Sequence, residues 1–343
     1  MDLTLNDDST DAATGDLARL RELAHAILAA SPDLPQAILP IQELRLLAER
    51  LSAMDMSVQV NIADGQSWLP SGLAVSPVNA ALCANEFLRS AAFIQGAARA
   101  MDAAAKRCEG RPVRVLYAGC GPYAFLLLPL LALWPAQRAQ FTMLDVHAAA
   151  LGPARRLVTA LGLDAGVEDW IQADAATLRL DSTALPDVIV SETMSAALKR
   201  EPQVAIARNL LGKAPDALMV PESVRIDCVL SERADDTAPW RDTTRLGQLF
   251  ALDAAAVARW DAAPDGALPA ATIILPADVA PHATLRLLTD ITTFDGVELT
   301  QGDCSLNTPR YLQGKPLFAG GQAVCFHYRL GADPGLDYTA LPA

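Results

Sequence analysis

The stretch Val115-Leu-Tyr-Ala-Gly119-Cys-Gly121-Pro-Tyr123 decides the fold class of this chain. Apolar residues of strand character run into a turn with two glycines, and an apolar run of helical character follows as far as Trp134. Glycine lets the backbone approach a ligand closely, and the N-terminus of a helix favours negative groups. The stretch predicts a strand, a ligand-binding turn and a helix, with Tyr117, Gly119 and Gly121 as candidate cofactor contacts. A pair of glycines can also serve a tight turn alone.

Further strands follow the glycine turn. Residues 141–145, 170–174 and 187–191 have the character of short strands, and helical patterns lie between them. Strands that alternate with helices form βαβ units around a parallel sheet. Residues 111–222 are therefore predicted to form a Rossmann-like α/β domain.

Two of these strands end in an acid that suits a nucleoside. Asp145 ends the strand after the glycine turn, where a carboxylate can accept both ribose hydroxyls. Asp174 ends the next strand and could accept from an adenine amino group, although a solvated loop acid is an equal alternative. Tyr123 stands where the dinucleotide fingerprint has its third glycine. This disfavours a pyrophosphate cradle and favours a cofactor without phosphates, such as S-adenosylmethionine.

A pair of glutamates follows the last strand. Asp187-Val-Ile-Val-Ser-Glu192-Thr-Met194 runs an apolar strand into an acid, and Glu201 lies a short loop further on. Residues just past the carboxyl end of a strand line the ligand crevice of an open α/β sheet. Two carboxylates there repel each other unless a cation lies between them, so they could orient a protonatable nitrogen. The alternative is two surface acids, with Glu201 paired to a neighbouring Lys199 or Arg200.

The regions on either side differ in character. Residues 1–14 are acidic and polar and are predicted to be a disordered tail, and residues 15–110 are predicted to be a helical N-terminal region with one long helix from Pro77 to about Lys106. Residues 223–343 contain several stretches of alternating apolar and polar residues, which predict a β-rich C-terminal domain. One helix-like segment, over 244–262, interrupts them.

Composition excludes several classes of protein. The chain has 343 residues, of which 52% are hydrophobic, and this argues against disorder for most of its length. A net charge of −13 argues against nucleic acid as a partner. No signal-peptide pattern opens the sequence, and the longest apolar run, 124–134, is too short for a bilayer. We expect a cytoplasmic protein without a membrane segment. Its His and Cys residues have no metal-ligand spacing.

Three motifs together resemble the protein arginine methyltransferases. The stretch with Glu192 and Glu201 resembles the double-glutamate loop of that family, and Leu218-Met-Val-Pro221-Glu-Ser-Val-Arg-Ile226 resembles the strand that leads into its β-barrel. Glu86-Phe-Leu-Arg89-Ser-Ala-Ala-Phe93 resembles its helix before the glycine turn, whose arginine holds the methionine carboxylate of the cofactor. The resemblance implies a class I S-adenosylmethionine fold, Arg89 as that carboxylate anchor, and a homodimer. A surface pairing of Arg89 with Glu86 is the alternative.

The chain departs from this family at the acceptor pocket. Thr193 stands where the family has a tryptophan, the threonine-histidine-tryptophan triplet is missing, and so is the tyrosine-rich N-terminal helix motif. Because those pieces close the arginine pocket in the family, we expect a small-molecule substrate instead. The sequence favours an S-adenosylmethionine-dependent methyltransferase in which Glu192 and Glu201 orient a nitrogen nucleophile.

Other functions use the same residues. The two glutamates could deprotonate the cofactor's own amine, whose attack on the methionine γ-carbon would form azetidine-2-carboxylic acid and release methylthioadenosine. A methyltransferase-like binding subunit without catalysis is a second alternative. A nicotinamide-dependent oxidoreductase is a third, disfavoured by Tyr123. The sequence alone does not separate methyl transfer from cyclisation.

Overall fold

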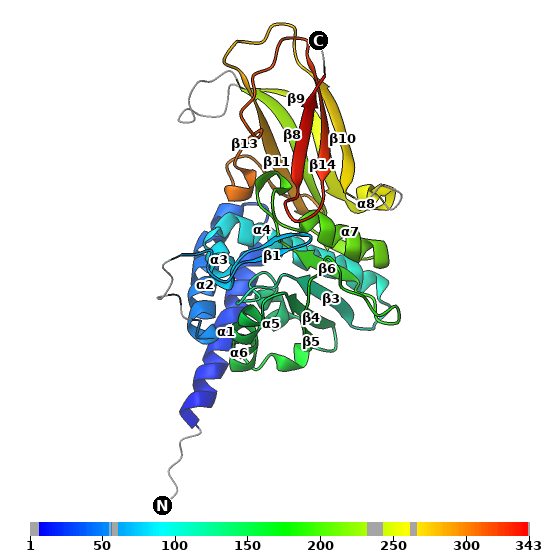
Figure 1. Cartoon of the computed structure of the whole chain (residues 1–343). Helices are drawn as coiled ribbons and strands as arrows, with labels where there is room; N and C mark the ends of the chain where they lie inside the picture. The colour runs from blue at the N-terminus through cyan, green and yellow to red at the C-terminus, as the bar shows by residue number, and fades with distance from the viewer. Residues whose placement is uncertain (1–6, 55, 57–60, 232–242, 261–265, 342–343) are drawn as a thin grey trace, which may run out of the picture.

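The computed structural model describes residues 7–54, 56, 61–231, 243–260 and 266–341. A β-rich unit lies over one end of an α/β unit, and the N-terminal helix extends from the opposite end (Figure 1). The centre of the α/β unit is a parallel sheet with the strand order β5-β4-β3-β6-β7. This confirms the predicted α/β class. The strands are β3 (Val113–Ala118), β4 (Ala139–Asp145), β5 (Val167–Gln172), β6 (Val188–Ser191) and β7 (Leu218–Val220).

The strand order opens a crevice at the middle of this sheet. The chain pairs β3 with β4 on one side and with β6 on the other, so the sheet has a topological switch point beside β3. Ligands of open α/β sheets bind at such a point, outside the carboxyl ends of the strands. Residues 188–190 of β6 are fully buried, as is typical of a strand covered on both faces. The helices of the unit are α4 (Phe87–Arg107), α5 (Leu128–Leu133), α6 (Ala148–Ala160) and α7 (Gln203–Lys213).

The N-terminal region is helical as predicted, but it begins earlier than expected. Helix α1 spans Asp7–Ala29 and α2 spans Ile38–Ser52. The predicted disordered tail over 1–14 is therefore wrong from residue 7, and residues 1–6 lie outside the described residues. Helix propagation fixes one residue per hydrogen bond gained, whereas nucleation is costly, so an established helix extends readily toward its end.

The predicted helix from Pro77 to Lys106 is broken in its first third. Ser76 caps α3 (Pro77–Leu82) by accepting from the Asn79 backbone N–H at 3.1 Å, and a 3-10 turn, η2 (Cys83–Asn85), separates α3 from α4. The Asn85 side chain donates to the Leu82 carbonyl at 3.1 Å. Such local side-chain bonds compete with the helical backbone pattern.

A short hairpin precedes α3, in a stretch that the sequence suggested to be irregular. It consists of β1 (Ser67–Leu69) and β2 (Gly72–Ala74), paired in antiparallel fashion. The dipeptide Ser71-Gly72 between two apolar pairs is a turn signal that could have predicted it.

The C-terminal region is β-rich, as predicted, and consists of two antiparallel sheets. One has the order β12-β11-β8-β9, with β13 paired to β11, and the other has the order β10-β14-β15. The strands are β8 (Ser223–Ser231), β9 (Thr243–Asp253), β10 (Ala267–Ile274), β11 (Thr284–Phe294), β12 (Val297–Leu299), β13 (Arg310–Tyr311), β14 (Ala323–Arg329) and β15 (Gly335–Ala340).

The helix predicted over 244–262 is wrong in its first half. That half forms β9, and only α8 (Ala254–Trp260) is helical. β9 pairs with β8 along the whole length of both strands. Cross-strand pairing in the sheet overrides a local pattern that reads equally as helix or strand.

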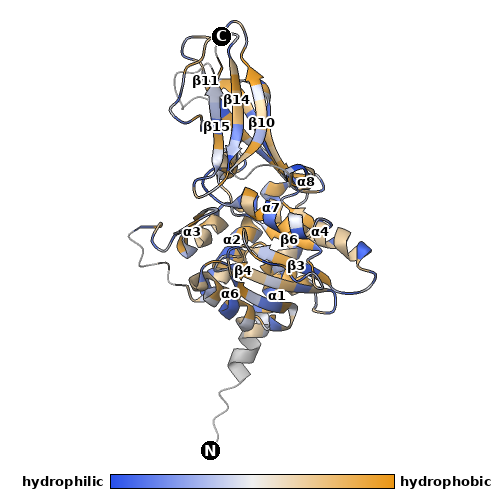
Figure 2. Ribbon diagram, turned by 45° about the vertical axis from the view of Figure 1, so that its right-hand side comes forward, coloured by the Kyte–Doolittle hydropathy of each residue, from blue (hydrophilic) through white to orange (hydrophobic). Residues whose placement is uncertain are grey.

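The two units are joined by direct packing. The Thr293 hydroxyl of β11 donates to the Ala92 carbonyl of α4 at 2.9 Å, and a Cβ on Gly96 would lie only 2.5 Å from the same hydroxyl. In Figure 2, hydrophobic colour gathers on α7 and β6 below the β-rich unit. This contact places the β-rich unit beside the carboxyl ends of the parallel strands.

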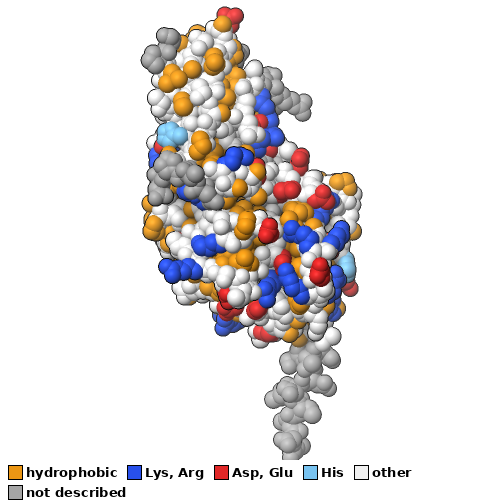
Figure 3. Space-filling view, turned by 90° about the vertical axis from the view of Figure 1, so that its right-hand side faces the viewer, with side chains coloured by type: hydrophobic (Ala, Val, Ile, Leu, Met, Phe, Trp, Pro, Cys, Tyr) orange, Lys and Arg blue, Asp and Glu red, His pale blue; other side chains and the backbone are white. Residues whose placement is uncertain are grey.

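The surface is mixed in charge. On the face in Figure 3, acidic and basic side chains are interspersed over the α/β unit, and the β-rich unit shows mostly uncharged atoms. Among the helices in the described ranges, none combines the length and the apolar character of a membrane span.

Candidate active site

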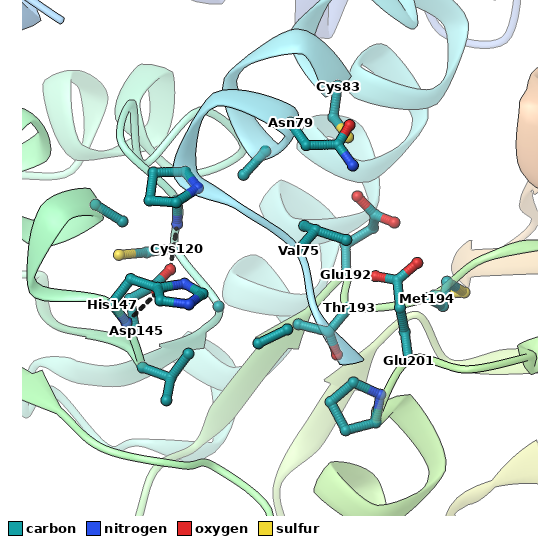
Figure 4. A pocket seen from close by; sticks show the side chains of 18 of the residues that line it. Val75, Asn79, Cys83, Cys120, Asp145, His147, Glu192, Thr193, Met194 and Glu201 are labelled. Carbon is teal, nitrogen blue, oxygen red and sulfur yellow. Dashed lines mark hydrogen bonds and ion pairs between the residues drawn. The ribbon is translucent and has the colours of Figure 1, made fainter. Parts of the chain in front are cut away.

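One cavity of about 280 Å³ opens at the carboxyl ends of the parallel strands (Figure 4). All the candidate site residues from the sequence line it, although they come from distant parts of the chain. They are Arg89, Tyr117, Gly119, Gly121, Asp145, Asp174, Glu192 and Glu201. The strand order accounts for most of this set, because the ends of β3, β4, β5 and β6 share one edge of the sheet, whereas Arg89 comes from α4 and Glu201 from the loop before α7.

The glycine turn after β3 has a backbone that other residues rarely adopt. Gly119 has φ 78° and Gly121 has φ 63°. A Cβ on Gly119 would also lie 2.5 Å from the Thr193 Cγ2 atom. The turn therefore needs glycine at 119 for its conformation and for the close approach of the loop after β6. Tyr117 is buried below the turn, and burial raises the pKa of its phenol well above the usual value.

Asp145 is tied to the glycine turn. Its Oδ2 accepts from the Gly121 backbone N–H at 2.9 Å, and its Oδ1 accepts from the His147 N–H at 2.9 Å. Burial raises the pKa of Asp145, and these backbone hydrogen bonds oppose the rise. A carboxylate oxygen has the capacity for two hydrogen bonds and each oxygen of Asp145 is shown with one, so Asp145 keeps acceptor capacity toward the cavity.

Asp174 lies two residues beyond β5, not at its end as predicted. Its Oδ1 accepts from the Ala176 backbone N–H at 2.8 Å, and its Oδ2 accepts from the Ser71 hydroxyl of the hairpin at 3.4 Å. The first contact is an Asx-type turn, in which an aspartate bonds the backbone two residues on. Asp174 thus shapes the rim of the cavity and also contacts the hairpin.

Arg89 is almost completely buried at the other side of the cavity. The side chain lies with Nε 3.8 Å from Glu192 Oε2, and Nη2 donates to the Cys83 carbonyl at 3.3 Å. Glu86 instead accepts from the Ser305 backbone N–H at 2.8 Å. The alternative of a surface pair between Arg89 and Glu86 is therefore wrong, and the break between α3 and α4 supplies a carbonyl to the guanidinium.

Glu192 and Glu201 face one another across the cavity (Figure 4). Burial raises the pKa of Glu192, while Arg89 opposes the rise. Burial and then the Glu192 charge raise the pKa of Glu201 to about 8, against the opposing charges of Arg89 and Arg200. The reading of two solvated surface acids is therefore wrong, since both carboxylates lie on the cavity and their titration is coupled.

The loop between the glutamates has a strained backbone and is held by hydrogen bonds to the β-rich unit. Ala197, Leu198 and Arg200 all have positive φ, at 62°, 52° and 72°. The Ala197 N–H donates to the Thr289 hydroxyl at 2.8 Å, and the Tyr328 hydroxyl donates to the Leu198 carbonyl at 2.7 Å. Backbone strain of this kind persists only where the surroundings over-determine it. The β-rich unit supplies that support.

The hairpin β1–β2 lines part of the cavity, through Leu69, Leu73 and Ala74. The sequence did not predict this hairpin. Its Ser67 hydroxyl lies 3.0 Å from His147 Nε2, and the Leu73 N–H donates to the Arg200 carbonyl at 2.7 Å. A Cβ on Gly72 would lie 2.7 Å from that carbonyl. Arg200 also lies over the Trp68 ring, 5.3 Å from its centroid. The hairpin therefore rests on the loop that carries Glu201.

Metal chemistry has no evident ligand set here. Within the described ranges, no group of three or more His, Cys, Asp or Glu side chains is arranged to hold a metal ion.

Comparison with known proteins gives structural likenesses alone. No protein-family model matches the chain, and no curated protein sequence matches it. Among solved structures, the chain is similar to the Trypanosoma brucei PRMT1 enzyme-prozyme heterotetrameric complex with AdoHcy, at 17% identity and a TM-score of 0.48, covering 75% of this chain and 97% of that one. It is also similar to Arabidopsis thaliana protein arginine methyltransferase 10 in an open conformation, at 12% identity and a TM-score of 0.45, covering 73% and 95%. Likeness at this level does not transfer an activity, so the function is argued below from the cavity.

Proposed function

We propose that this protein is an S-adenosylmethionine-dependent methyltransferase that acts on a nitrogen of a small molecule. The observation that carries the proposal is the meeting of a buried guanidinium, a buried carboxylate bonded to a glycine turn and a pair of half-buried glutamates in one cavity. These are the groups that an amino-acid carboxylate, a ribose and an amine require. Each was proposed from the sequence for that role.

The residues fit the cofactor in chemistry and arrangement. Arg89 would hold the methionine carboxylate, and a guanidinium suits a carboxylate through two parallel hydrogen bonds. Asp145 would accept from the ribose hydroxyls with its remaining lone pairs. Because Gly119 and Gly121 carry no side chain, the backbone of the turn is open to the adenosyl group. Tyr117 and Asp174 would complete this end of the site.

When bound, the cofactor supplies a methyl group on a sulfonium that is already activated for displacement. The protein then has to position the nucleophile and remove its proton. Glu192 and Glu201 would hold the nitrogen between them, and a cation placed there lowers the pKa of both carboxylates. Glu192 is paired with Arg89, so Glu201, with a pKa of about 8, is the better proton acceptor.

The enclosure of the glutamates supports a small acceptor. The hairpin β1–β2 contacts the Glu201 loop directly through Leu73 and Gly72. Thr193 stands where the protein arginine methyltransferases have a tryptophan that helps to close their arginine pocket. The homodimer and the cytoplasmic location stay predictions.

Nucleoside products test the proposal. Purified protein is incubated with S-adenosylmethionine alone and then with a panel of small amines, and the nucleosides are identified by mass spectrometry. We expect S-adenosylhomocysteine to form only when an amine is present. Methylthioadenosine without an acceptor would overturn the proposal in favour of ring closure by the cofactor. Methylation of an arginine peptide in preference to every small amine would contradict the substrate class, and failure to bind the cofactor would indicate a non-catalytic subunit.

A further inference from the structure

One fully buried amide ties the two ends of the glutamate loop together. Gln203 is the first residue of α7, two residues after Glu201, and its side chain is 0% exposed. Its Oε1 accepts from the Thr193 backbone N–H at 3.0 Å and from the Thr193 hydroxyl at 2.9 Å, and its Nε2 donates to the Ser191 carbonyl at 3.1 Å. The amide thus contacts the residues immediately before and after Glu192.

The orientation of this amide follows from its partners. A backbone N–H only donates and a backbone carbonyl only accepts, so Oε1 must face Thr193 and Nε2 must face Ser191. Burying a primary amide is unfavourable unless its hydrogen bonds are made. An apolar side chain would fill the same space but would leave both backbone groups buried without these partners.

The same threonine also contacts the glycine turn. Thr193 Cγ2 occupies the space that a Cβ on Gly119 would need, at 2.5 Å. A chain of contacts therefore runs from the Glu201 segment through Gln203 and Thr193 to the turn after β3. These contacts hold residues 191–193 in place relative to Glu201 and to the proposed cofactor site.

We propose that Gln203 is a positioning residue. It sets the separation of the Glu192 and Glu201 carboxylates and their position relative to the glycine turn. This role rests on the proposed function, because the separation matters to catalysis only if both acids hold one acceptor nitrogen. The loop between the two glutamates has three residues with positive φ, and a strained loop persists only where its surroundings hold it. The hydrogen bonds of Gln203 hold the two ends of this loop together. Thr193 acts with Gln203, since its hydroxyl donates to Gln203 Oε1. Thr193 stands at the position where the arginine methyltransferases that the sequence resembles have a tryptophan.

The titration of Glu201 measures this separation. The charged or titratable groups around it are Glu192, Arg89, Arg200 and the Cys83 thiol. The pKa of Glu201 is raised to about 8 by burial and by the Glu192 carboxylate, so it falls if the carboxylates move apart or open to solvent. A residue that only contributes to folding would not move it.

The experiment is a carbon-13 NMR titration of labelled glutamate carboxyls, with the Glu201 signal assigned from Glu201→Gln. We expect Gln203→Met to lower the pKa of Glu201 by about one unit and Thr193→Val to lower it by less, because the Thr193 N–H still donates to Oε1. The matched control is Gln95→Met, since Gln95 is a buried glutamine that donates to the Ile27 carbonyl away from the cavity. It should leave the titration unchanged.

Unchanged Glu201 titration in folded Gln203→Met would overturn the proposal. If Gln203→Met does not fold, Thr193→Val is the deciding variant. A Glu201 titration in Thr193→Val that equals that of the wild type would also overturn the proposal. Calorimetry with S-adenosylmethionine on the same samples separates this outcome from failure of the proposed function. Wild-type protein that does not bind the cofactor refutes the function, whereas normal binding with an unmoved titration refutes only the positioning role.

Discussion

The Arg89 guanidinium and the Glu192 carboxylate form a buried ion pair, with Nε 3.8 Å from Oε2. The pair joins the two halves of the proposed site, because Arg89 would hold the cofactor and Glu192 would orient the acceptor. A cofactor carboxylate on Arg89 would share the guanidinium with Glu192. The electrostatics of the two ligand sites are therefore coupled before any ligand is bound.

Replacing Glu192 should affect stability, binding and turnover differently. Glu192→Gln leaves Arg89 without its partner, so we expect a loss of about 3 kcal/mol in the free energy of unfolding of the free protein. Because the cofactor carboxylate then becomes the main counter-charge of Arg89, S-adenosylmethionine should raise the melting temperature more in the variant than in the wild type. Turnover should fall ~100-fold or more.

Thermal unfolding with and without the cofactor checks this, and Glu222→Gln is the control because Glu222 also accepts from a backbone N–H, that of Asp295, but does not line the cavity. A loss of cofactor affinity as large as the loss of turnover would count against the role of Glu192.

Removing either proposed cofactor anchor should weaken binding. Arg89→Ala and Asp145→Ala each delete a charged partner of a buried ligand group, so we expect the dissociation constant for S-adenosylmethionine to rise roughly 10- to 100-fold. Isothermal titration calorimetry measures this. Lys106→Ala, on the exposed last turn of the same helix as Arg89, is the control and should bind normally. Unchanged affinity in either anchor variant would refute that assignment.

The raised pKa of Glu201 predicts a pH dependence of stability. Its ordinary value is 4.5 and its value in the fold is about 8. A carboxyl with a raised pKa in the folded state favours folding fully below its unfolded value, and that contribution is lost as the pH rises through the folded value. Between pH 5 and pH 9 the wild type should therefore lose more stability than Glu201→Gln.

Urea unfolding at pH 5 and pH 9 gives the comparison, with an expected difference on the order of a few kcal/mol. The Asp145 carboxyl is common to both proteins and cancels, whereas any change in the titration of Glu192 belongs to the measured difference, because the two glutamates are coupled. Parallel pH profiles for the two proteins would show that Glu201 titrates normally in the fold.

The hairpin should slow the release of the cofactor. Gly72→Ala places a Cβ 2.7 Å from the Arg200 carbonyl at a φ of 142°, so the hairpin must shift away from the glutamate loop. We expect stopped-flow dissociation of S-adenosylhomocysteine to accelerate about 10-fold, as for the opening of an active-site lid. Gly162→Ala is the control, since it also has a positive φ but nothing within 4 Å of its Cβ. Equal rates in both variants would mean that the hairpin does not gate release.

The sequence predicted that the candidate residues meet in one place because of a general property of parallel sheets. Asp145 ends one strand and Glu192 follows another, both strands can be recognised from the sequence alone, and the carboxyl ends of parallel strands share one edge. Their convergence needed no knowledge of side-chain packing. Arg89 came from the resemblance, and its burial against Glu192 depends on a helix break that the helical pattern of the sequence hides.

The residues that the sequence missed act through tertiary contacts. Gln203 opens a helix, where a polar residue is ordinarily solvated, and only the fold shows that its amide is enclosed between Ser191 and Thr193. The segment over 244–253 read as helix, and its pairing with β8 along the whole strand, a contact that the local pattern does not contain, makes it a strand. The hairpin did carry a local signal in Ser71-Gly72, but its contact with Arg200 has none.

The most direct test of the account is a crystal structure with S-adenosylhomocysteine bound. The account predicts the amino-acid carboxylate against the Arg89 guanidinium, the ribose hydroxyls on Asp145, and the sulfur directed toward the space between Glu192 and Glu201. A crystal soaked at saturating ligand whose cavity holds no ligand, or a ligand bound with its carboxylate away from Arg89, would contradict it.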